Sequence, residues 1–191
     1  MDKKESIGKL GLILFIITAV AGLILGIVFN ITQDSIAKQE TMKNENAMKE
    51  LITTADKFEK KDLSLTGNIL EVNEGKKGSE TMGYTMKVST KGYGGQIQLM
   101  VGINKDGKLA GIKILSQSET AGLGANSEKP SFYGQYAGKP TNKDVEVVKT
   151  EPAADNEIKA ITGATITSKG VTSGVNEAIK FYKENLQGGN K

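Results

Sequence analysis

The chain has 191 residues, of which 38% are hydrophobic and 25% are charged, values that suit one ordinary globular domain and exclude wholesale disorder. It contains no Cys and no His, which excludes disulfide scaffolds, thiol nucleophiles, Cys-ligated zinc or iron–sulfur sites, and catalytic triads that need a histidine. All 25 basic residues are Lys and the formal net charge is +3, so the chain lacks the guanidinium groups that read guanine and grip phosphate, and we expect no nucleic-acid partner.

A long apolar segment lies close to the N-terminus. Residues 10–29 read LGLILFIITAVAGLILGIVF, and a helix of this length spans about 30 Å, the thickness of the hydrocarbon core of a bilayer. A cleaved signal peptide is the alternative, because Ala19-Val20-Ala21 resembles a cleavage site, but the apolar residues continue past it to Phe29. We therefore predict an uncleaved transmembrane helix over residues 10–29.

The lysines around this segment predict its orientation in the cell membrane. Lys3, Lys4 and Lys9 precede the apolar residues, and the first lysine after them is Lys38. Because positive residues stay on the cytoplasmic side, residues 1–9 are expected in the cytoplasm and everything after residue 29 outside it.

Residues 30–60 are predicted to form a helical stalk. From Ile31 to about Ile52 the chain has no Gly or Pro and is rich in helix-forming residues. Ala37, Met48, Leu51 and Ile52 give it a weak apolar face. We expect the membrane helix to continue as a stalk and then to dock on a domain.

Short apolar and alternating segments then predict an antiparallel sheet. The expected strands are residues 63–65, 69–72, 84–88, 96–103 and 109–115. Asp106-Gly107, between the last two strands, is a strong signal for a hairpin. A short helix near residues 131–137 and a strand at residues 145–148 should follow the hairpin.

The last element is predicted to be an amphipathic helix. Its apolar residues fall on one helical face and are Val171, Val175, Ala178, Ile179 and Tyr182. Thr167 and Ser168 are suitable N-cap residues for it. The prediction is an α+β fold: one transmembrane helix, a stalk, one domain over residues 61–187 with a sheet flanked by helices, and a flexible tail at residues 188–191.

Two segments could hold a ligand. Residues 162–168 read TGATITS and place four hydroxyl side chains and a glycine just before the last helix, where free N–H groups favour a phosphate. Residues 119–124 read ETAGLG and form a glycine-rich loop after the hairpin. Read alone, the first segment could also be a plain helix cap and the second a plain turn.

Together, and in this order, these motifs resemble the family of covalent FMN-binding domains. Thr162-Gly163-Ala164-Thr165 is similar to its [S/T]-G-A-T sequence, residues 119–124 to its E-T-P-G-L-G segment, and residues 92–95 (GYGG) to its G-Y-x-G segment. With one N-terminal span, the chain resembles the G subunits of Rnf-type electron transport complexes in particular. The closely related alternative is the family of C subunits of sodium-pumping NADH:quinone reductases, whose members are usually longer.

The resemblance implies a site and a maturation step. A flavin transferase would attach FMN through a phosphoester to Thr165, beside Thr162, Gly163 and Ala164, and the ring would lie against Glu119, Thr120, Leu123 and Gly124. Two residues depart from the family pattern. Lys159 stands three residues before the motif where Asp is common, and Ala121 replaces the usual Pro.

The resemblance also implies a function. The chain would carry electrons through covalent FMN within an ion-translocating ferredoxin:NAD⁺ oxidoreductase, with integral membrane and iron–sulfur subunits as partners. It would have no catalytic residue and no metal of its own. A free-standing FMN carrier outside the membrane and a non-catalytic scaffold stay open as alternatives, and a bound chromophore would exclude the scaffold.

Overall fold

The computed structural model describes residues 7–187, so residues 1–6 and the tail predicted at residues 188–191 lie outside the described residues. The chain divides into two compact units, of which one ends at Lys43 and the other begins at Asn44. The membrane helix and the folded domain are therefore described separately.

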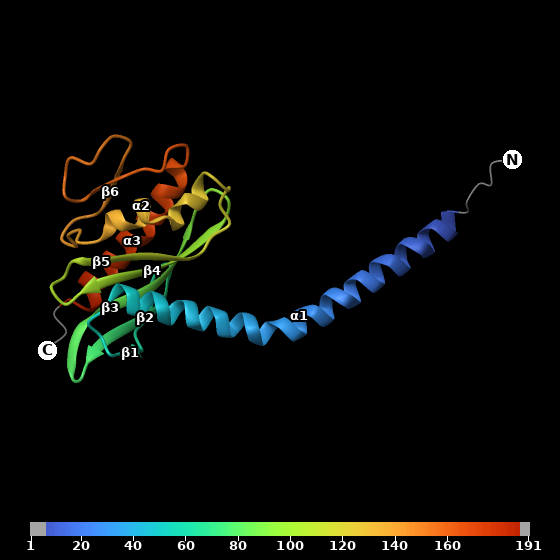
Figure 1. Ribbon diagram of the computed structural model, residues 1–191, viewed down its shortest axis with the longest axis horizontal. Coiled ribbons are helices and arrows are strands. Elements are labelled where there is room, and N and C mark those ends of the chain that lie inside the picture. Colours follow the sequence, from blue (N-terminus) through green and yellow to red (C-terminus); the bar gives the residue numbers. More distant parts are fainter. Residues whose placement is uncertain (1–6, 188–191) are drawn as a thin grey trace. The chain divides into compact units, whose positions relative to one another are not determined.

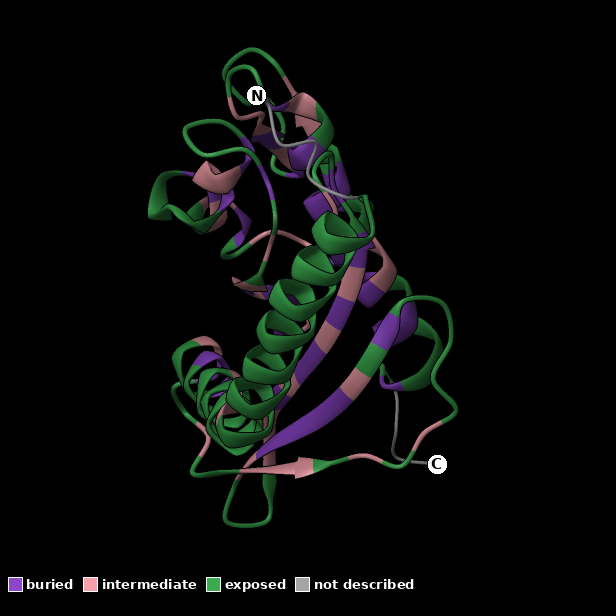
Figure 2. Ribbon diagram, turned by 90° about the vertical axis from the view of Figure 1, so that its right-hand side faces the viewer, coloured by how far each residue is buried: buried purple, intermediate pink, exposed green. Residues whose placement is uncertain are grey.

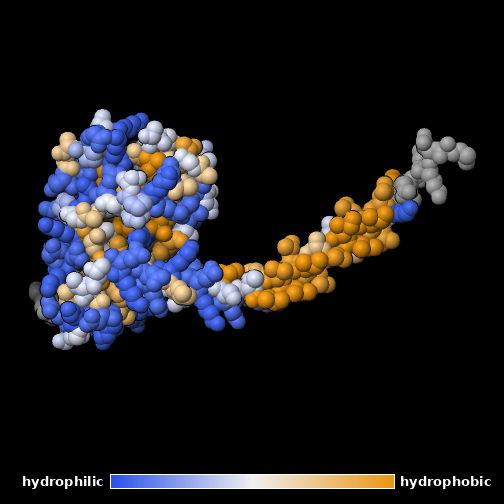
Figure 3. Space-filling view, viewed as in Figure 1, coloured by the Kyte–Doolittle hydropathy of each residue, from blue (hydrophilic) through white to orange (hydrophobic). Residues whose placement is uncertain are grey.

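Helix α1 runs without interruption from Ile7 to Leu51. Among the described residues it is the helix that is long and apolar enough to cross a membrane, and none of its most apolar window is buried. Figure 3 shows the apolar surface along its first part. The predicted span over residues 10–29 thus lies in a helix that fits a single-pass anchor.

The folded unit is built on an antiparallel sheet (Figure 1). Within the described residues its strand order is β1-β2-β3-β4-β5. The bounds of these strands are β1 Lys57–Lys60, β2 Ile69–Lys77, β3 Glu80–Lys91, β4 Gln96–Asn104 and β5 Leu109–Ser116. The predicted hairpin is confirmed: β4 and β5 pair antiparallel, and the turn between them contains Gly107 at a φ of 76°. A left-handed φ of this kind favours glycine, which explains the Asp-Gly signal.

Short elements connect the sheet to the last helix. They are η1 Gly124–Glu128, α2 Pro130–Tyr133, η2 Gly134–Tyr136, β6 Glu146–Val148 and β7 Glu157–Lys159, followed by α3 Thr165–Asn185. The strands β6 and β7 pair in parallel. The α+β fold with an antiparallel sheet flanked by helices is as predicted.

Helix α3 covers one face of the sheet and forms the main core with it. The five apolar residues predicted to share one face of α3 are all buried, and β3, β4 and β5 contribute Val88, Leu99, Val101 and Ile112 to the same cluster. Figure 2 shows buried stretches along the long strands. The buried hydroxyl of Tyr136, in the same core, shares a 2.7 Å hydrogen bond with Thr172 Oγ1 of α3.

The last two turns of α1 pack on the opposite face of the sheet. Ala47 and Met48 are buried against Met100 of β4, and Glu50 forms an ion pair with Lys113 of β5. This ion pair raises the pKa of Lys113. The end of the predicted stalk thus packs on the sheet, as expected, whereas Ala37, predicted on the same weak apolar face, is exposed.

Three predictions about local structure are wrong. Residues 63–65 form no strand, because Leu63 packs on the core from a connecting loop. The helix of the stalk ends at Leu51, next to the Ile52 expected, but residues 57–60, which were placed in the stalk, form β1. Helix α3 begins at Thr165, earlier than expected, so Thr167 and Ser168 lie within its first turn and do not cap it.

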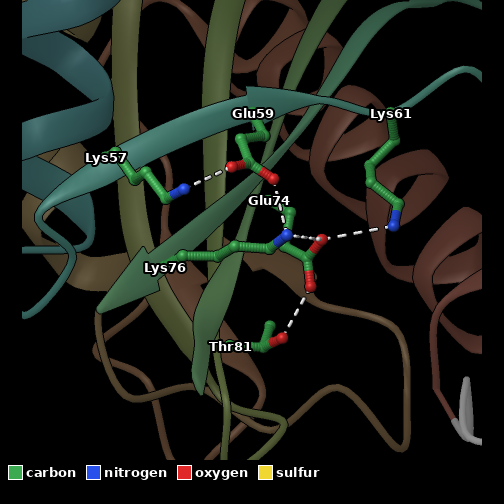
Figure 4. Close-up of polar contacts among 6 residues, drawn as sticks. All are labelled: Lys57, Glu59, Lys61, Glu74, Lys76 and Thr81. Atoms are coloured by element: carbon green, nitrogen blue, oxygen red, sulfur yellow. Dashed lines mark hydrogen bonds and ion pairs between the residues drawn. The ribbon is translucent and has the colours of Figure 1, made fainter. Parts of the chain in front are cut away.

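Charged side chains link strand β1 to β2 (Figure 4). Hydrogen bonds from Lys57 and Lys76 to the carboxylate of Glu59 lower its pKa to about 2. Burial alone would raise the pKa of Glu74, but hydrogen bonds from Thr81 and Lys61 outweigh it, and the pKa is lowered. These charge-assisted bonds stabilise a strand that has little apolar surface of its own.

Candidate functional site

A cavity of about 420 Å³ opens where three loop segments meet. It lies between the turn after β3, the loop after β5 and the start of α3. Its lining residues in the described chain are Tyr93, Glu119, Thr120, Leu123, Gly124, Gly163, Ala164, Thr165, Ile166 and Thr167. A cavity of this size suits a small-molecule cofactor.

The start of α3 lines this cavity with unbonded backbone N–H groups. The N-cap residue Ala164 makes no side-chain capping bond, and no described residue accepts a hydrogen bond from the backbone N–H groups of Thr165, Ile166 and Thr167. Such N–H groups at a helix N-terminus, together with the helix dipole, favour a phosphate. Gly163, at a φ of 77°, turns the chain into the helix and brings it close to Leu123.

The four hydroxyls of the T-G-A-T-I-T-S segment differ in whether they have a hydrogen-bond partner. Thr167 Oγ1 donates to Glu119 Oε2, while Ser168 Oγ accepts from Ile161 N at 2.9 Å and donates to Ala164 O at 3.0 Å. The hydroxyls of Thr162 and Thr165 have no hydrogen-bond partner among the described residues, and of these two only Thr165 lines the cavity. Thr165 is therefore the hydroxyl of this segment that both lacks a hydrogen-bond partner among the described residues and lines the cavity.

Glu119 joins all three segments of the site. Its carboxylate accepts a hydrogen bond from Gly94 N at 2.8 Å through Oε1 and one from Thr167 Oγ1 through Oε2. Its own N–H donates to Gln117 Oε1 at 2.6 Å. Only 8% of the residue is exposed, and it forms part of the wall of the cavity.

The glycines of the motifs make room for this carboxylate. A Cβ at Gly124 would lie 2.6 Å from Thr167 Oγ1 and closer still to Glu119 Oε2, and a Cβ at Gly92 would overlap Glu119 Oε1. Both glycines are buried. Close approach of the backbone to Glu119 thus explains why glycine occupies both positions.

The structure brings together all but one of the site residues expected from the sequence. Glu119, Thr120, Leu123, Gly124, Gly163, Ala164 and Thr165 line the cavity, whereas Thr162 lines an adjoining hollow. Lys159 lines that hollow too; it forms an ion pair with Glu151, and its backbone N–H donates to Gln135 Oε1 at 2.7 Å. Ala121 is exposed and lines neither space.

Three further lining residues, Tyr93, Ile166 and Thr167, are not among the site residues expected from the sequence. Tyr93 is 71% exposed and Ile166 58% exposed, and both are on the rim of the cavity. Together with Leu123, these side chains gather exposed apolar surface at one cavity, and a contiguous patch of this kind is typical of a ligand-binding groove. Tyr93 could have been found, because it is the aromatic residue of the G-Y-G-G motif. Residues 7–187 contain no cluster of three or more acidic or histidine side chains that could hold a metal ion.

Comparison with known protein families matches both parts of the chain. The family described as the FMN-binding domain matches residues 92–180, and the family described as the RnfG N-terminal region matches residues 1–51. All three segments of the cavity lie inside the first match.

Two relatives are similar over most of their length. The G subunit of the Na⁺-translocating ferredoxin:NAD⁺ oxidoreductase complex of Acetobacterium woodii is 41% identical over 189 residues, covering 92% of this chain and 91% of the relative. The G subunit of the proton-translocating ferredoxin:NAD⁺ oxidoreductase complex of Clostridium ljungdahlii is 39% identical over 161 residues, covering 84% and 83%.

A solved structure shares the folded domain. The C subunit of the Na⁺-translocating NADH-quinone reductase from Parabacteroides distasonis superimposes with a TM-score of 0.55 and 29% identity, over 63% of this chain and 64% of that one. The G subunits are similar over a larger part of the chain, including α1. The chain therefore belongs to the family of G subunits of Rnf-type ion-translocating oxidoreductase complexes and contains an FMN-binding domain.

Proposed function

We propose that this chain is a membrane-anchored flavoprotein subunit that carries electrons through FMN within an ion-translocating ferredoxin:NAD⁺ oxidoreductase complex. Membership of the G-subunit family, the FMN-binding domain and the apolar helix α1 support this proposal. Bound FMN supplies the redox chemistry, while the protein supplies position and electrostatics. Because the chain is one member of a complex, turnover needs the other integral membrane and iron–sulfur subunits.

The free hydroxyl of Thr165 at the N-terminus of α3 carries the proposal that the flavin is covalent. In the proposed maturation, Thr165 Oγ1 attacks the phosphorus of the FMN half of FAD. A new P–O bond forms, the pyrophosphate bond breaks, AMP leaves, and the hydroxyl proton is released. A threonine hydroxyl is a weak nucleophile, so a flavin transferase with Mg²⁺ must activate the reaction.

The surroundings of Thr165 suit the product of this reaction. The phosphoester would lie at the first-turn N–H groups of α3, which substitute for the arginines that the chain lacks. Leu123 and Ile166 offer apolar surface to a ring, and Thr120 offers a hydroxyl to its polar edge. Thr162 lies outside this cavity, so we propose that it supports the motif without contacting the ring.

We also propose the orientation of the chain. Residues 1–9 would be cytoplasmic, residues 10–29 would cross the cell membrane, and the stalk and the FMN-binding domain would lie outside the cytoplasm. Lys3, Lys4 and Lys9 before the span support this orientation through the positive-inside rule. A covalent link suits that location, because FMN lost outside the cytoplasm is not readily replaced.

The test is replacement of Thr165 in the full chain, co-expressed with a flavin transferase. We expect Thr165→Val to fold, because valine keeps the shape of threonine, but to lose both in-gel fluorescence under ultraviolet light and the mass increment of about 438 Da for an added FMN less water. Thr162→Val is the matched control and should keep the increment. An adduct on Thr162, Thr167 or Ser168 in the unchanged sequence, or no adduct at all, would contradict the covalent proposal.

A further inference from the structure

One acidic side chain stands out in the wall of the cavity. Among the ten lining residues, Glu119 is the one that carries a charge, and the other nine are small, apolar or uncharged polar residues. Whatever fills the cavity therefore lies next to a single fixed negative charge. Because burying a carboxylate away from water is unfavourable, its presence in this wall calls for an explanation.

Within the described residues, no lysine forms an ion pair with this carboxylate. Its partners are the N–H of Gly94 and the hydroxyl of Thr167, both of which are uncharged donors. Hydrogen bonds of this kind hold and partly stabilise a carboxylate but leave its net charge in place. With 8% of the residue exposed, water screens that charge only weakly.

We propose that Glu119 lowers the reduction potential of the flavin bound in this cavity. The inference deepens the proposed function and rests on it. When a flavin takes up two electrons and one proton, the ring gains one negative charge. A second negative charge held nearby in a poorly screened site opposes that gain, so the oxidised form is favoured.

A purely mechanical role makes a different prediction. As a clamp between Gly94 and Thr167, Glu119 would affect folding and flavin loading but would leave the potential of loaded protein unchanged. Glu119→Gln separates the two roles, because its amide oxygen can still accept from Gly94 N, its amide group can still bond to Thr167 Oγ1, and the charge is removed.

The experiment uses the full chain, loaded with flavin by a co-expressed transferase and purified in detergent. Its potential is measured by spectroelectrochemical titration at pH 7, with dithionite supplying the electrons. We expect Glu119→Gln to raise the ratio of reduced to oxidised flavin at least tenfold at a fixed ambient potential, which is about 30 mV for a two-electron couple. Glu128→Gln is the matched control: it removes an exposed charge from η1, can still accept the hydrogen bond from Gln117, and should leave the potential unchanged.

Thr167→Val gives an independent test with the opposite sign. It removes a hydrogen-bond donor from the carboxylate and keeps the charge, so we expect the potential to fall. If Glu119→Gln fails to fold or to load flavin, the change in reduction potential of Thr167→Val tests the inference instead. An unchanged or lower potential in loaded Glu119→Gln, or an unchanged or higher one in Thr167→Val, would overturn the inference. Absence of flavin from the unchanged chain would instead refute the proposed function, and the inference with it.

Discussion

Replacing Gly124 by alanine tests whether the wall of the cavity is as tightly packed as the structure shows. The added methyl group would lie 2.6 Å from Thr167 Oγ1 and closer to Glu119 Oε2, at the point where these two groups bond. Overpacking of this kind costs about 1–3 kcal/mol, and weakening the hydrogen bond to the carboxylate adds about 1 kcal/mol or more. We therefore expect the free energy of unfolding to fall by about 2–4 kcal/mol.

The assay is thermal unfolding of the full chain in detergent, followed by near-ultraviolet circular dichroism. All five tyrosines lie between residues 84 and 182, so their signal reports on the folded unit and not on α1. A loss of about 2–4 kcal/mol corresponds to a fall in melting temperature of roughly 5–15 °C for a domain of this size.

The matched control is Gly134→Ala. Gly134 has a φ of −64°, and a Cβ there would meet nothing within 4 Å. Alanine at this position should leave the protein as stable as before or stabilise it by about 0.4–1 kcal/mol. If Gly124→Ala melts at the same temperature as this control, Glu119 and Thr167 do not make the close contact that the structure shows.

Two other predictions concern the sheet. The folded-state pKa of Glu59 is lowered to about 2 from its ordinary value of 4.5. The stabilising contribution of Glu59 is therefore present above pH 4.5 and is lost as the pH falls toward 2. We expect the melting temperature to fall over this range, and to fall less in Glu59→Gln and in high salt. In urea unfolding, Met48→Ala should lower the free energy of unfolding by about 2–4 kcal/mol, because it removes the packing of Met48 against Met100 and leaves a cavity. Met42→Ala, at an exposed position of α1, should have little effect. Equal effects of the two variants would show that the end of α1 does not pack on the sheet.

The sequence predicted best those elements whose apolar residues recur with the period of a strand or a helix. The β4–β5 hairpin and the buried face of α3 follow from periods of 2 and 3.6 residues, which arise because one side of each element is buried. Strand β1 was missed because its four residues, KFEK, carry no such period and depend on ion pairs with β2.

The candidate site was likewise predictable in its local motifs and not in the contacts between distant residues. The motifs were visible in the sequence, and the resemblance to a known family indicated that they belong together. The hydrogen bond from Thr167 to Glu119 joins residues 48 positions apart, and no local pattern encodes it. For the same reason the local pattern did not separate the hydroxyl of Thr165 from the bonded ones of Thr167 and Ser168, and only the family resemblance pointed to Thr165.

Strand β1 also protects the domain from self-association. It is the outermost strand at one side of the five-stranded sheet within the described residues, and such a strand exposes backbone groups that can pair with another chain. Four residues offer little length for pairing, and Lys57, Glu59 and Lys60 would each lose hydration if a second strand were added. Copies of this domain crowded side by side at a membrane surface would therefore resist joining edge to edge into a continuous sheet.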